Sequence, residues 1–385
     1  MKTVYLDYAA TAPRNPDIVN KTATFSLSRY ANIGRGLYTL SEEAQSLYRE
    51  SKKTVAQWVW CDPVEVIYTY STTYAINLVT LALEHNDILG KWDVILLSQS
   101  EHHANIVPWQ ILAERVGAVI KFVQLDAYFQ IDMDHLKTLF DSHVKVVSLQ
   151  YASNVTGALH PLEKVRDIIG RDVLFFVDAA QVVMHWPIDM RWIGADGVVF
   201  SGHKIMADTW IGVLTLWKVL QKAWQCPLGG GGAINFVTEK WHEQAGLPEK
   251  WEPGTPHITG AISLKHAIDV LTNTGPEKHQ KYRELVHSTT DRFRSLEQQK
   301  ILRLFHSDTP HALGIWSFAL PNIHCHNIAE SLDKYHICVR SGHHCCEPLH
   351  LSWWTPGTVR VSIGFETTQE EIDAFFTSLQ KIIVS

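Results

Sequence analysis

Seven short apolar runs, rich in β-branched and aromatic residues, constrain the fold of this chain more than any other feature of its sequence. They lie at 66–70, 94–98, 118–124, 144–149, 173–178, 197–201 and 212–216. Segments with helical periodicity separate several of them, at 74–84, 108–116 and 161–169. Strands that alternate with helices of this length are typical of a largely parallel sheet with helices on both faces, so the sequence predicts an α/β fold.

One connection is too short for that pattern. Residues 202–211 alone separate the last two runs. A parallel crossover needs about a dozen residues or more, so we expect this pair of strands to be antiparallel. The prediction is therefore a mixed, mostly parallel sheet of about seven strands.

The chain is long enough for two domains, because a single core rarely keeps growing beyond about 250–300 residues and this chain has 385. From Leu264 a helical pattern returns after a long irregular stretch, and a smaller α+β unit is expected to begin there. The predicted large domain spans 15–262. The predicted small domain combines 1–14 with 263–385.

Two stretches carry little regular pattern. Residues 1–40 contain several proline and glycine breakers and are expected to be irregular, and a long loop region is expected at 229–260. An amphipathic helix is predicted from Ala44 onward. Another closes the chain, and Thr368 and Glu371 form a capping box at its start.

Charge and composition exclude several functions. The formal net charge is -6, so neither a nucleic acid nor an anionic membrane surface would attract the chain electrostatically. No uninterrupted run of 18 or more apolar residues occurs, and the amino terminus lacks the apolar segment of a signal peptide. Six cysteines, two of them adjacent, do not suggest a disulfide framework. These features favour a cytoplasmic protein with reduced cysteines.

The apolar run at 197–201 ends in Ser201 and is followed by Gly202, His203 and Lys204. In open α/β sheets, ligands bind at the carboxyl edge of the strands. A lysine in such a crevice loses solvation, and its pKa falls from about 10.4 toward neutrality, which frees the amine to attack a carbonyl. Schiff-base chemistry with pyridoxal phosphate is one use of such a lysine. The alternative is a solvated lysine in a loop.

Three further side chains follow apolar runs. Asp178 ends one of them, and a carboxylate there needs a partner such as the protonated nitrogen of a pyridine ring, unless it caps the next helix. Gln181 either donates to an oxygen of such a ring or is a surface amide. His102 either stacks on a flat cofactor or marks the start of a helix.

Two other positions have the chemistry of anion sites. Thr72 and Thr73 lead from a strand into a helix, where hydroxyls and free N–H groups form an anion site or an ordinary cap. Arg360 interrupts a strand, and a guanidinium there needs a carboxylate. A substrate or a structural salt bridge would supply it.

The stretch Gly342-His343-His344-Cys345-Cys346 has two interpretations. A thiolate flanked by imidazoles and Arg340 would be a nucleophile with a depressed pKa. Alternatively, the stretch joins His324-Cys325-His326 to bind zinc, although adjacent ligands fit a tetrahedron poorly.

Together these residues resemble the pyridoxal-phosphate-dependent cysteine desulfurases of the class V aminotransferase superfamily, and specifically their SufS-like (group II) branch. The resemblance covers nearly the whole chain. Its most specific motifs lie at 101–109, 177–181, 201–204 and 340–345. The short Gly-His-His-Cys context points to group II, since the other branch carries a longer mobile cysteine loop. The resemblance implies fold type I of the pyridoxal-phosphate enzymes, a mostly parallel seven-stranded sheet with a smaller α+β domain.

The resemblance also implies roles for the matching positions. Lys204 would bind the cofactor covalently and move the Cα proton, Cys345 would be the nucleophile, and Arg360 would bind the substrate carboxylate. The other positions would contact pyridoxal phosphate, and they are His102, Asn154, Asp178, Gln181, Ser201, His203, Thr72, Thr73 and, from the partner subunit of a homodimer, Thr255. No metal ligand is implied.

The implied reaction converts L-cysteine to L-alanine and leaves the sulfur on Cys345 as a persulfide. A SufE- or SufU-like acceptor protein would then take the sulfur for iron–sulfur cluster assembly. Two alternatives stay open: a selenocysteine lyase on the same scaffold, and a cofactor-free zinc-binding or scaffold protein.

The sequence departs from the family pattern at several positions. Trp210 stands where members carry a glycine, so this residue is strained if the position needs a positive φ. Ser71 and Tyr74 replace the usual Gly and Glu beside the threonine pair. Glu366 replaces an Asn near Arg360, where a carboxylate would compete with substrate.

Overall fold

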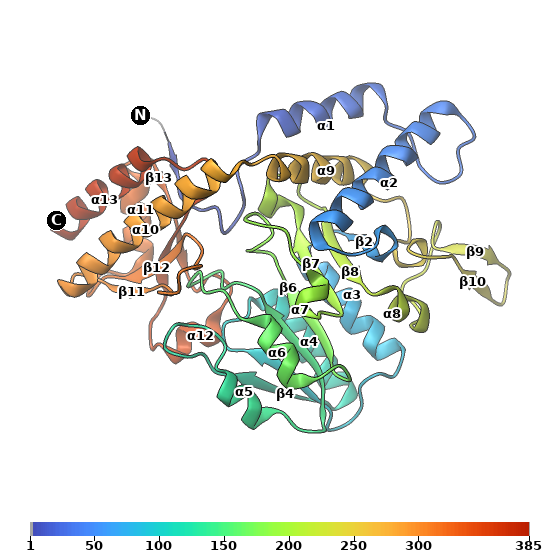
Figure 1. Ribbon diagram of the computed structural model, residues 1–385, viewed down its shortest axis with the longest axis horizontal. Coiled ribbons are helices and arrows are strands. Elements are labelled where there is room, and N and C mark those ends of the chain that lie inside the picture. The colour runs from blue at the N-terminus through green and yellow to red at the C-terminus, as the bar shows by residue number, and fades with distance from the viewer. Residues whose placement is uncertain (1–2, 385) are drawn as a thin grey trace.

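The computed structural model describes residues 3–384, and a seven-stranded sheet forms its centre (Figure 1). The strand order is β2-β8-β7-β6-β5-β3-β4. The strands are β2 (Val66–Thr69), β3 (Val94–Ser98), β4 (Val119–Val123), β5 (Val144–Gln150), β6 (Leu174–Asp178), β7 (Gly197–Ser201) and β8 (Gly212–Leu216). The β7–β8 pair is antiparallel, as the short connection predicts, and β2 also pairs antiparallel with β8. The remaining pairs are parallel, so the predicted mixed α/β sheet is confirmed.

The strands read as continuous apolar runs because both faces of the sheet are buried. In β3, Val94 and Leu96 belong to one apolar cluster, whereas Ile95 and Leu97 belong to another. The first cluster includes side chains from α2 (Thr39–Val59), α5 (Met133–Leu139), α6 (Leu162–Ile169), α7 (Met190–Ile193) and α9 (Ile258–Thr272). The second includes side chains from α3 (Thr72–His85) and α4 (Val107–Val116).

A second, smaller core lies beside the large sheet. Its antiparallel sheet has the order β11-β12-β15-β14, formed by β11 (Arg303–Phe305), β12 (Ile315–Ala319), β15 (Thr358–Ser362) and β14 (Arg340–Gly342). Three helices pack on it: α10 (Pro276–Gln298), α11 (Cys325–Asp333) and α13 (Gln369–Val384). Phe293, Trp316 and Phe375 are fully buried there. The predicted capping box of α13 is present, since Thr368 and Glu371 exchange backbone-to-side-chain hydrogen bonds.

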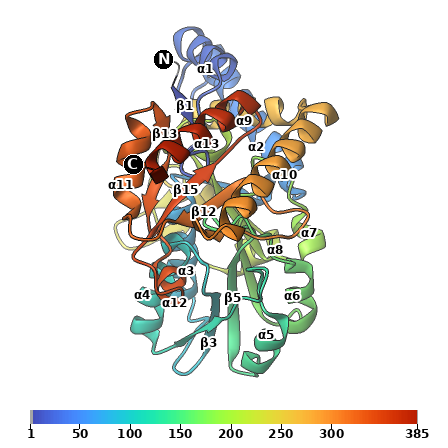
Figure 2. The same cartoon turned by 90° about the vertical axis from the view of Figure 1, so that its left-hand side faces the viewer.

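The amino terminus joins this second core. Strand β1 (Val4–Tyr5) pairs in parallel with β13 (Ile337–Cys338). Figure 2 shows β1 and β13 together at the end of the molecule that carries α13. The chain then crosses to the large sheet, so residues 6–12 run between the two cores.

The prediction that residues 1–40 are irregular is wrong, because α1 (Pro16–Ser28) lies within them. Pro16 reads as a breaker in sequence, yet the first position of a helix tolerates proline, since its N–H would have no partner there. The side chain of Asn15 caps the helix by accepting a hydrogen bond from the N–H of Asp17 at 2.9 Å. The buried face of α1 carries Ile18 and Phe25.

The long loop expected at 229–260 is also partly wrong. It contains an antiparallel hairpin of β9 (Ile234–Val237) and β10 (His242–Gln244), followed by a short 3₁₀ turn, Glu249–Trp251. The hairpin projects from the molecule on the right of Figure 1. Its rings of Phe236 and Trp241 pack on each other and are more than half exposed. A strand pair without a buried face has no continuous apolar run, which explains why the sequence of this hairpin shows little strand pattern.

Helix α9 shows where the two cores divide. Its predicted face, with Leu264, Ala267 and Leu271, is buried as expected. These side chains pack in the large core together with α2, and α10 is the first helix after them that packs in the smaller core. We therefore propose that the domain boundary follows α9 instead of lying at 262/263. No helix among residues 3–384 has the length and apolarity needed to cross a membrane.

Candidate active site

Lys204 lies at the carboxyl edge of the large sheet. Strand β7 ends at Ser201, and the 3₁₀ turn Gly202–Ile205 carries His203 and Lys204 away from it. The Lys204 Nζ donates a hydrogen bond to the Ala9 carbonyl, in the segment that joins the two cores. Burial, together with the charge of Arg360, lowers the pKa of Lys204 to about 7, against the opposing effect of Asp178. A large fraction of this amine is therefore neutral near pH 7.

Asp178 ends β6, beside β7, and is 4% exposed. Within the described chain, its carboxylate accepts a hydrogen bond from the Ala180 N–H at 2.9 Å. Burial raises the pKa of Asp178 to about 6, although that hydrogen bond and Lys204 oppose the shift. The side chain of Gln181 donates to the Ala9 carbonyl at 3.1 Å, the same oxygen that Lys204 contacts. These contacts gather Lys204, Asp178 and Gln181 at one edge of the sheet.

Of the two roles that the sequence left open for His102, the structure shows the one at the start of a helical turn. Its Nδ1 accepts a hydrogen bond from the Ala104 N–H at 3.0 Å, so the imidazole caps the turn η2 (His103–Asn105). Burial and the nearby Lys204 lower the pKa of His102 to about 3. The ring is thus neutral, and because Nδ1 is an acceptor, the proton lies on Nε2. The electrostatic effect of Lys204 shows that the ring shares this site.

Glu101 is a site residue that sequence reasoning missed. It is fully buried, and its carboxyl group contacts the Ser98 hydroxyl, the Asn105 amide and the Gln150 N–H at 2.5, 2.7 and 2.8 Å. Burial raises the pKa of Glu101 to about 8, so the group is largely protonated near pH 7. The signal in the sequence was an acidic residue three positions after the end of a buried strand, and its network supports the loop of His102.

Two of the residues predicted to bind the phosphate, Thr72 and Ser201, are in contact. The hydroxyls of Thr72 and Ser201 lie 2.8 Å apart, and the Thr72 N–H donates to Ser201 Oγ at 2.8 Å. Thr73 is exposed in the same first turn of α3. His203 has a different hydrogen-bond partner, since its Nδ1 contacts Thr11 Oγ1 at 3.3 Å. Thr255 is exposed and lines a small pocket with Tyr70, Tyr74 and Ile211.

Trp210 adopts the left-handed conformation that the glycine substitution suggested, with φ 61°. Its side chain is 72% exposed, and its ring packs edge-on against Tyr70 at 6.3 Å between centroids. The loop therefore keeps a backbone shape that suits glycine. A residue with a side chain is destabilised in this conformation because its Cβ lies close to the following carbonyl oxygen.

We expect the Trp210→Gly variant to be more stable than the Trp210→Ala variant, by about 1 kcal/mol. Both variants lose the ring contact with Tyr70, so they differ in the steric cost of a Cβ at positive φ. At the exposed neighbour Thr209, which lacks a positive φ, the order should reverse, with alanine more stable than glycine by about 0.5–1 kcal/mol. Urea unfolding of the four variants measures both differences. The same order at both positions would contradict the expectation.

Arg360 is 1% exposed on β15. Its Nη2 donates to Asp7 at 2.9 Å, and its Nη1 donates to the Asn154 carbonyl at 3.0 Å. The structural salt bridge weighed from the sequence is therefore present. The expected competitor Glu366 lies elsewhere, exposed and paired with Lys278. The carboxylate beside Arg360 is that of Asp7.

Two buried polar atoms at this place lack hydrogen-bond partners within residues 3–384. They are Arg360 Nε and Asn154 Oδ1. The Asn154 amide meanwhile donates to the His344 carbonyl at 2.8 Å, which turns the asparagine toward the loop of Cys345. Buried polar atoms normally have hydrogen-bond partners, so a bound polar ligand could supply the partners that this donor and this acceptor lack.

The two adjacent cysteines have different surroundings. Cys345 is half-buried with φ 57°, and its Sγ lies 3.5 Å from Arg340 Nη2. Cys346 is fully buried, its Sγ donates to the Ser100 carbonyl at 3.3 Å, and burial raises its pKa far above the usual range. The thiol of Cys345 is the accessible one beside a guanidinium, whereas Cys346 packs with Val155 and Leu349.

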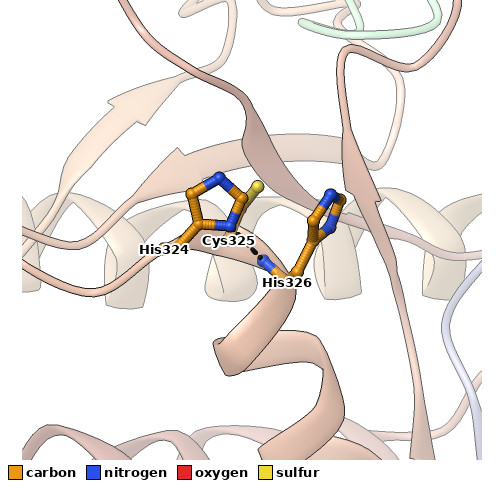
Figure 3. A group of neighbouring side chains, drawn as sticks. All are labelled: His324, Cys325 and His326. Carbon is orange, nitrogen blue, oxygen red and sulfur yellow. Dashed lines mark hydrogen bonds between the residues drawn. The ribbon is translucent and has the colours of Figure 1, made fainter.

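The alternative zinc site is confined to His324, Cys325 and His326, whose ligand atoms lie within 4.8 Å of one another (Figure 3). Residues 343–346 do not join this group. The His324 Nδ1 accepts the His326 N–H as the cap of α11, which places the proton on Nε2, the other atom available to a metal. The donor set thus fits zinc poorly.

Known proteins resemble this chain over nearly its whole length. The family model described as aminotransferase class-V matches residues 4–375. A probable cysteine desulfurase from Synechocystis sp. is 38% identical, with 99% of this chain and 91% of that protein covered. A cysteine desulfurase from Escherichia coli O127:H6 is 33% identical, with 98% and 93% covered.

Solved structures agree with these matches. The apo cysteine desulfurase from Thermococcus onnurineus superimposes with a TM-score of 0.94 at 32% identity, covering 99% of this chain and 94% of that one. The cysteine desulfurase CsdA from Escherichia coli gives 0.90 at 29% identity, covering 98% and 94%. A NifS-like protein, at 21% identity and a TM-score of 0.83 with both chains fully covered, shares the fold.

Proposed function

Because the chain belongs to the aminotransferase class-V family, we propose that it is a pyridoxal-phosphate-dependent cysteine desulfurase. The observation that carries this proposal is a buried amine of lowered pKa, Lys204, at the carboxyl edge of the sheet beside the buried carboxylate of Asp178. The names of the relatives supply the substrate, L-cysteine.

The residues present fit the cofactor. Asp178 is a buried carboxylate that a ring N–H⁺ would stabilise, and the Thr72–Ser201 pair at the start of α3 suits a phosphate. His102, Gln181 and Asn154 would contact the ring from other sides, together with Thr73, His203 and the partner subunit's Thr255. When bound, pyridoxal phosphate supplies an aldehyde that accepts an amine and a cationic ring that withdraws electrons from Cα.

The chain's own groups would bind the substrate and move its protons. Lys204 Nζ, whose pKa of about 7 gives it a substantial neutral fraction near pH 7, is suited to remove and hold the Cα proton. Arg360 Nε and Asn154 Oδ1 would bind polar groups of L-cysteine, since neither atom has a partner within residues 3–384. The neutral ring of His102 would cover the site and exclude water.

Cys345 would accept the sulfur. Its thiolate attacks the sulfur of the substrate, an S–S bond forms as the substrate's C–S bond breaks, and the carbon takes a proton to become alanine. Arg340 Nη2, 3.5 Å from Sγ, would stabilise the thiolate. We propose that the resulting persulfide passes to a SufE- or SufU-like acceptor for iron–sulfur cluster assembly in the cytoplasm, as in the SufS-like branch.

A homodimer is part of the same proposal. Large apolar side chains are exposed on the segment between α1 and α2 and on the β9–β10 hairpin, including Leu37 at 98% and Val237 at 60%. Both segments project on the right of Figure 1. Burying them against a second copy would remove apolar surface from water. Thr255 is exposed and therefore available to a partner's cofactor site.

The pKa of Lys204 predicts how the cofactor-free protein takes up pyridoxal phosphate. Since only the neutral amine attacks the aldehyde, the uptake rate should rise about tenfold per pH unit below the pKa of about 7 and level off above it. Absorbance of the reconstituted protein between about pH 5.5 and about pH 9.5 measures the rate. A rate that still climbs above about pH 9, as for an ordinary lysine of pKa about 10.4, would contradict the lowered pKa.

The test of the function is to incubate the holoenzyme with L-cysteine and measure both products. We expect L-alanine in solution and one added sulfur atom, located on Cys345 by mass analysis of peptides. Formation of alanine without protein-bound sulfur would contradict the proposed persulfide step. Neither product, in protein shown by absorbance to carry the cofactor, would refute the proposed function.

A further inference from the structure

A cleft of about 890 Å³ lies between the smaller core and the large unit. Neither Lys204, Asp178 nor Cys345 lines it. One wall comes from α10 and the segment 306–313 of the smaller core, and the other from 159–161 and 185–186 of the large unit. Its volume falls within the range of about 300–1,000 Å³ that is typical of small-molecule sites.

The wall of this cleft includes an aromatic cluster that spans the two units. The ring of His185 lies 5.0 Å from Tyr282, 5.7 Å from Phe365 and 5.8 Å from Trp186. His185 is 6% exposed, and its Nδ1 has no hydrogen-bond partner in the described chain. The cleft thus offers flat aromatic surfaces against which the ring of a ligand would pack.

Among the charged side chains of the described residues that line the cleft, the guanidinium of Arg283 has no ion-pair partner. Arg294 is neutralised by Glu297 and Asp308, and His287 contacts Asp291 at 3.0 Å. Arg283 also lines the cleft, is exposed, and has no ion-pair partner among residues 3–384. A free guanidinium at the edge of an aromatic cleft suits a carboxylate.

We propose that this cleft binds a small aromatic carboxylate, with its ring against Trp186 and Phe365 and its anionic group at Arg283. The ligand would contact both units, so its binding would also oppose their separation. The cleft borders the proposed catalytic centre, because His185 also lines the small pocket that contains Gln181 and Lys204, but neither of these two residues lines the cleft itself.

Calorimetric titration of the holoenzyme with indole-3-acetate tests the proposal. Indole, which lacks the carboxylate, and acetate, which lacks the aromatic ring, serve as control ligands. We expect one indole-3-acetate per chain and weaker binding of both fragments. Arg283→Gln should weaken binding about tenfold, since it removes a charge-assisted hydrogen bond. Lys281→Gln removes a positive charge from the same helix outside the cleft, and it should leave the affinity unchanged.

Two results would overturn the proposal: no binding of indole-3-acetate, or equal weakening by Lys281→Gln and Arg283→Gln, which would indicate non-specific charge attraction. Ala312→Trp gives a second test, because Ala312 lines the cleft and a large ring there would fill it. This variant should lose indole-3-acetate binding and keep alanine production. Undiminished binding by Ala312→Trp would place the ligand elsewhere.

Discussion

Replacing Lys204 by alanine should abolish desulfurase turnover, with a loss on the order of 10³-fold or more, because the variant lacks both the amine that binds the cofactor and the base that moves the Cα proton. Alanine formation from L-cysteine measures the loss. Borohydride treatment followed by peptide mass analysis should find pyridoxal phosphate attached at residue 204 in the parent protein and absent from the variant.

The matched variant is Lys204→Arg, which keeps a long basic side chain at the same position but cannot form the covalent link. It should be as inactive as the alanine variant. The fold should survive both changes, since the hydrogen bond from Nζ to Ala9 is a small part of a site that also contains the Gln181–Ala9 contact. Turnover by Lys204→Arg at more than about a tenth of the parent rate would exclude Lys204 as the essential amine.

Replacing Cys345 by alanine should give the second large effect. The variant should keep the cofactor absorbance, because no described contact joins Cys345 to Lys204, Asp178 or Thr72, and should lose persulfide formation completely. Turnover should fall by roughly 10²–10³-fold, because no thiolate remains beside Arg340 to attack the substrate sulfur. Mass analysis after cysteine treatment and alanine assays measure the two effects.

Cys346→Ala is the control for this change. Its sulfur is buried among Val155 and Leu349, so we expect a stability loss of about 1–2 kcal/mol with turnover within a few-fold of the parent. If Cys346→Ala lost the bound sulfur while Cys345→Ala retained it, the two roles would have to be exchanged.

The large sheet could be predicted from the sequence because both of its faces are buried. Its strands therefore appear as continuous apolar runs, and the ten residues between the last two strands determine their antiparallel pairing. Helix α1 and the β9–β10 hairpin escaped prediction for opposite reasons. Pro16 suggests a helix breaker in the sequence, although it begins a helix. The exposed hairpin has no buried face, so its sequence does not alternate between apolar and polar residues.

The sequence placed the site residues at strand ends but could not show which of them touch. The pairing of Arg360 with Asp7 joins positions 353 residues apart, and no local pattern reveals it. Glu366, selected from a motif departure, instead pairs with Lys278. The left-handed backbone of Trp210 followed from the missing glycine, because backbone shape is a local property that a motif can carry.

The loop of Cys345 is fastened to the large unit on both sides of the sulfur. The Cys345 carbonyl accepts the His103 N–H at 2.8 Å, and the His344 carbonyl accepts the Asn154 amide at 2.8 Å. Separation of the two units would therefore break both hydrogen bonds and would move Cys345 away from His103 and Asn154.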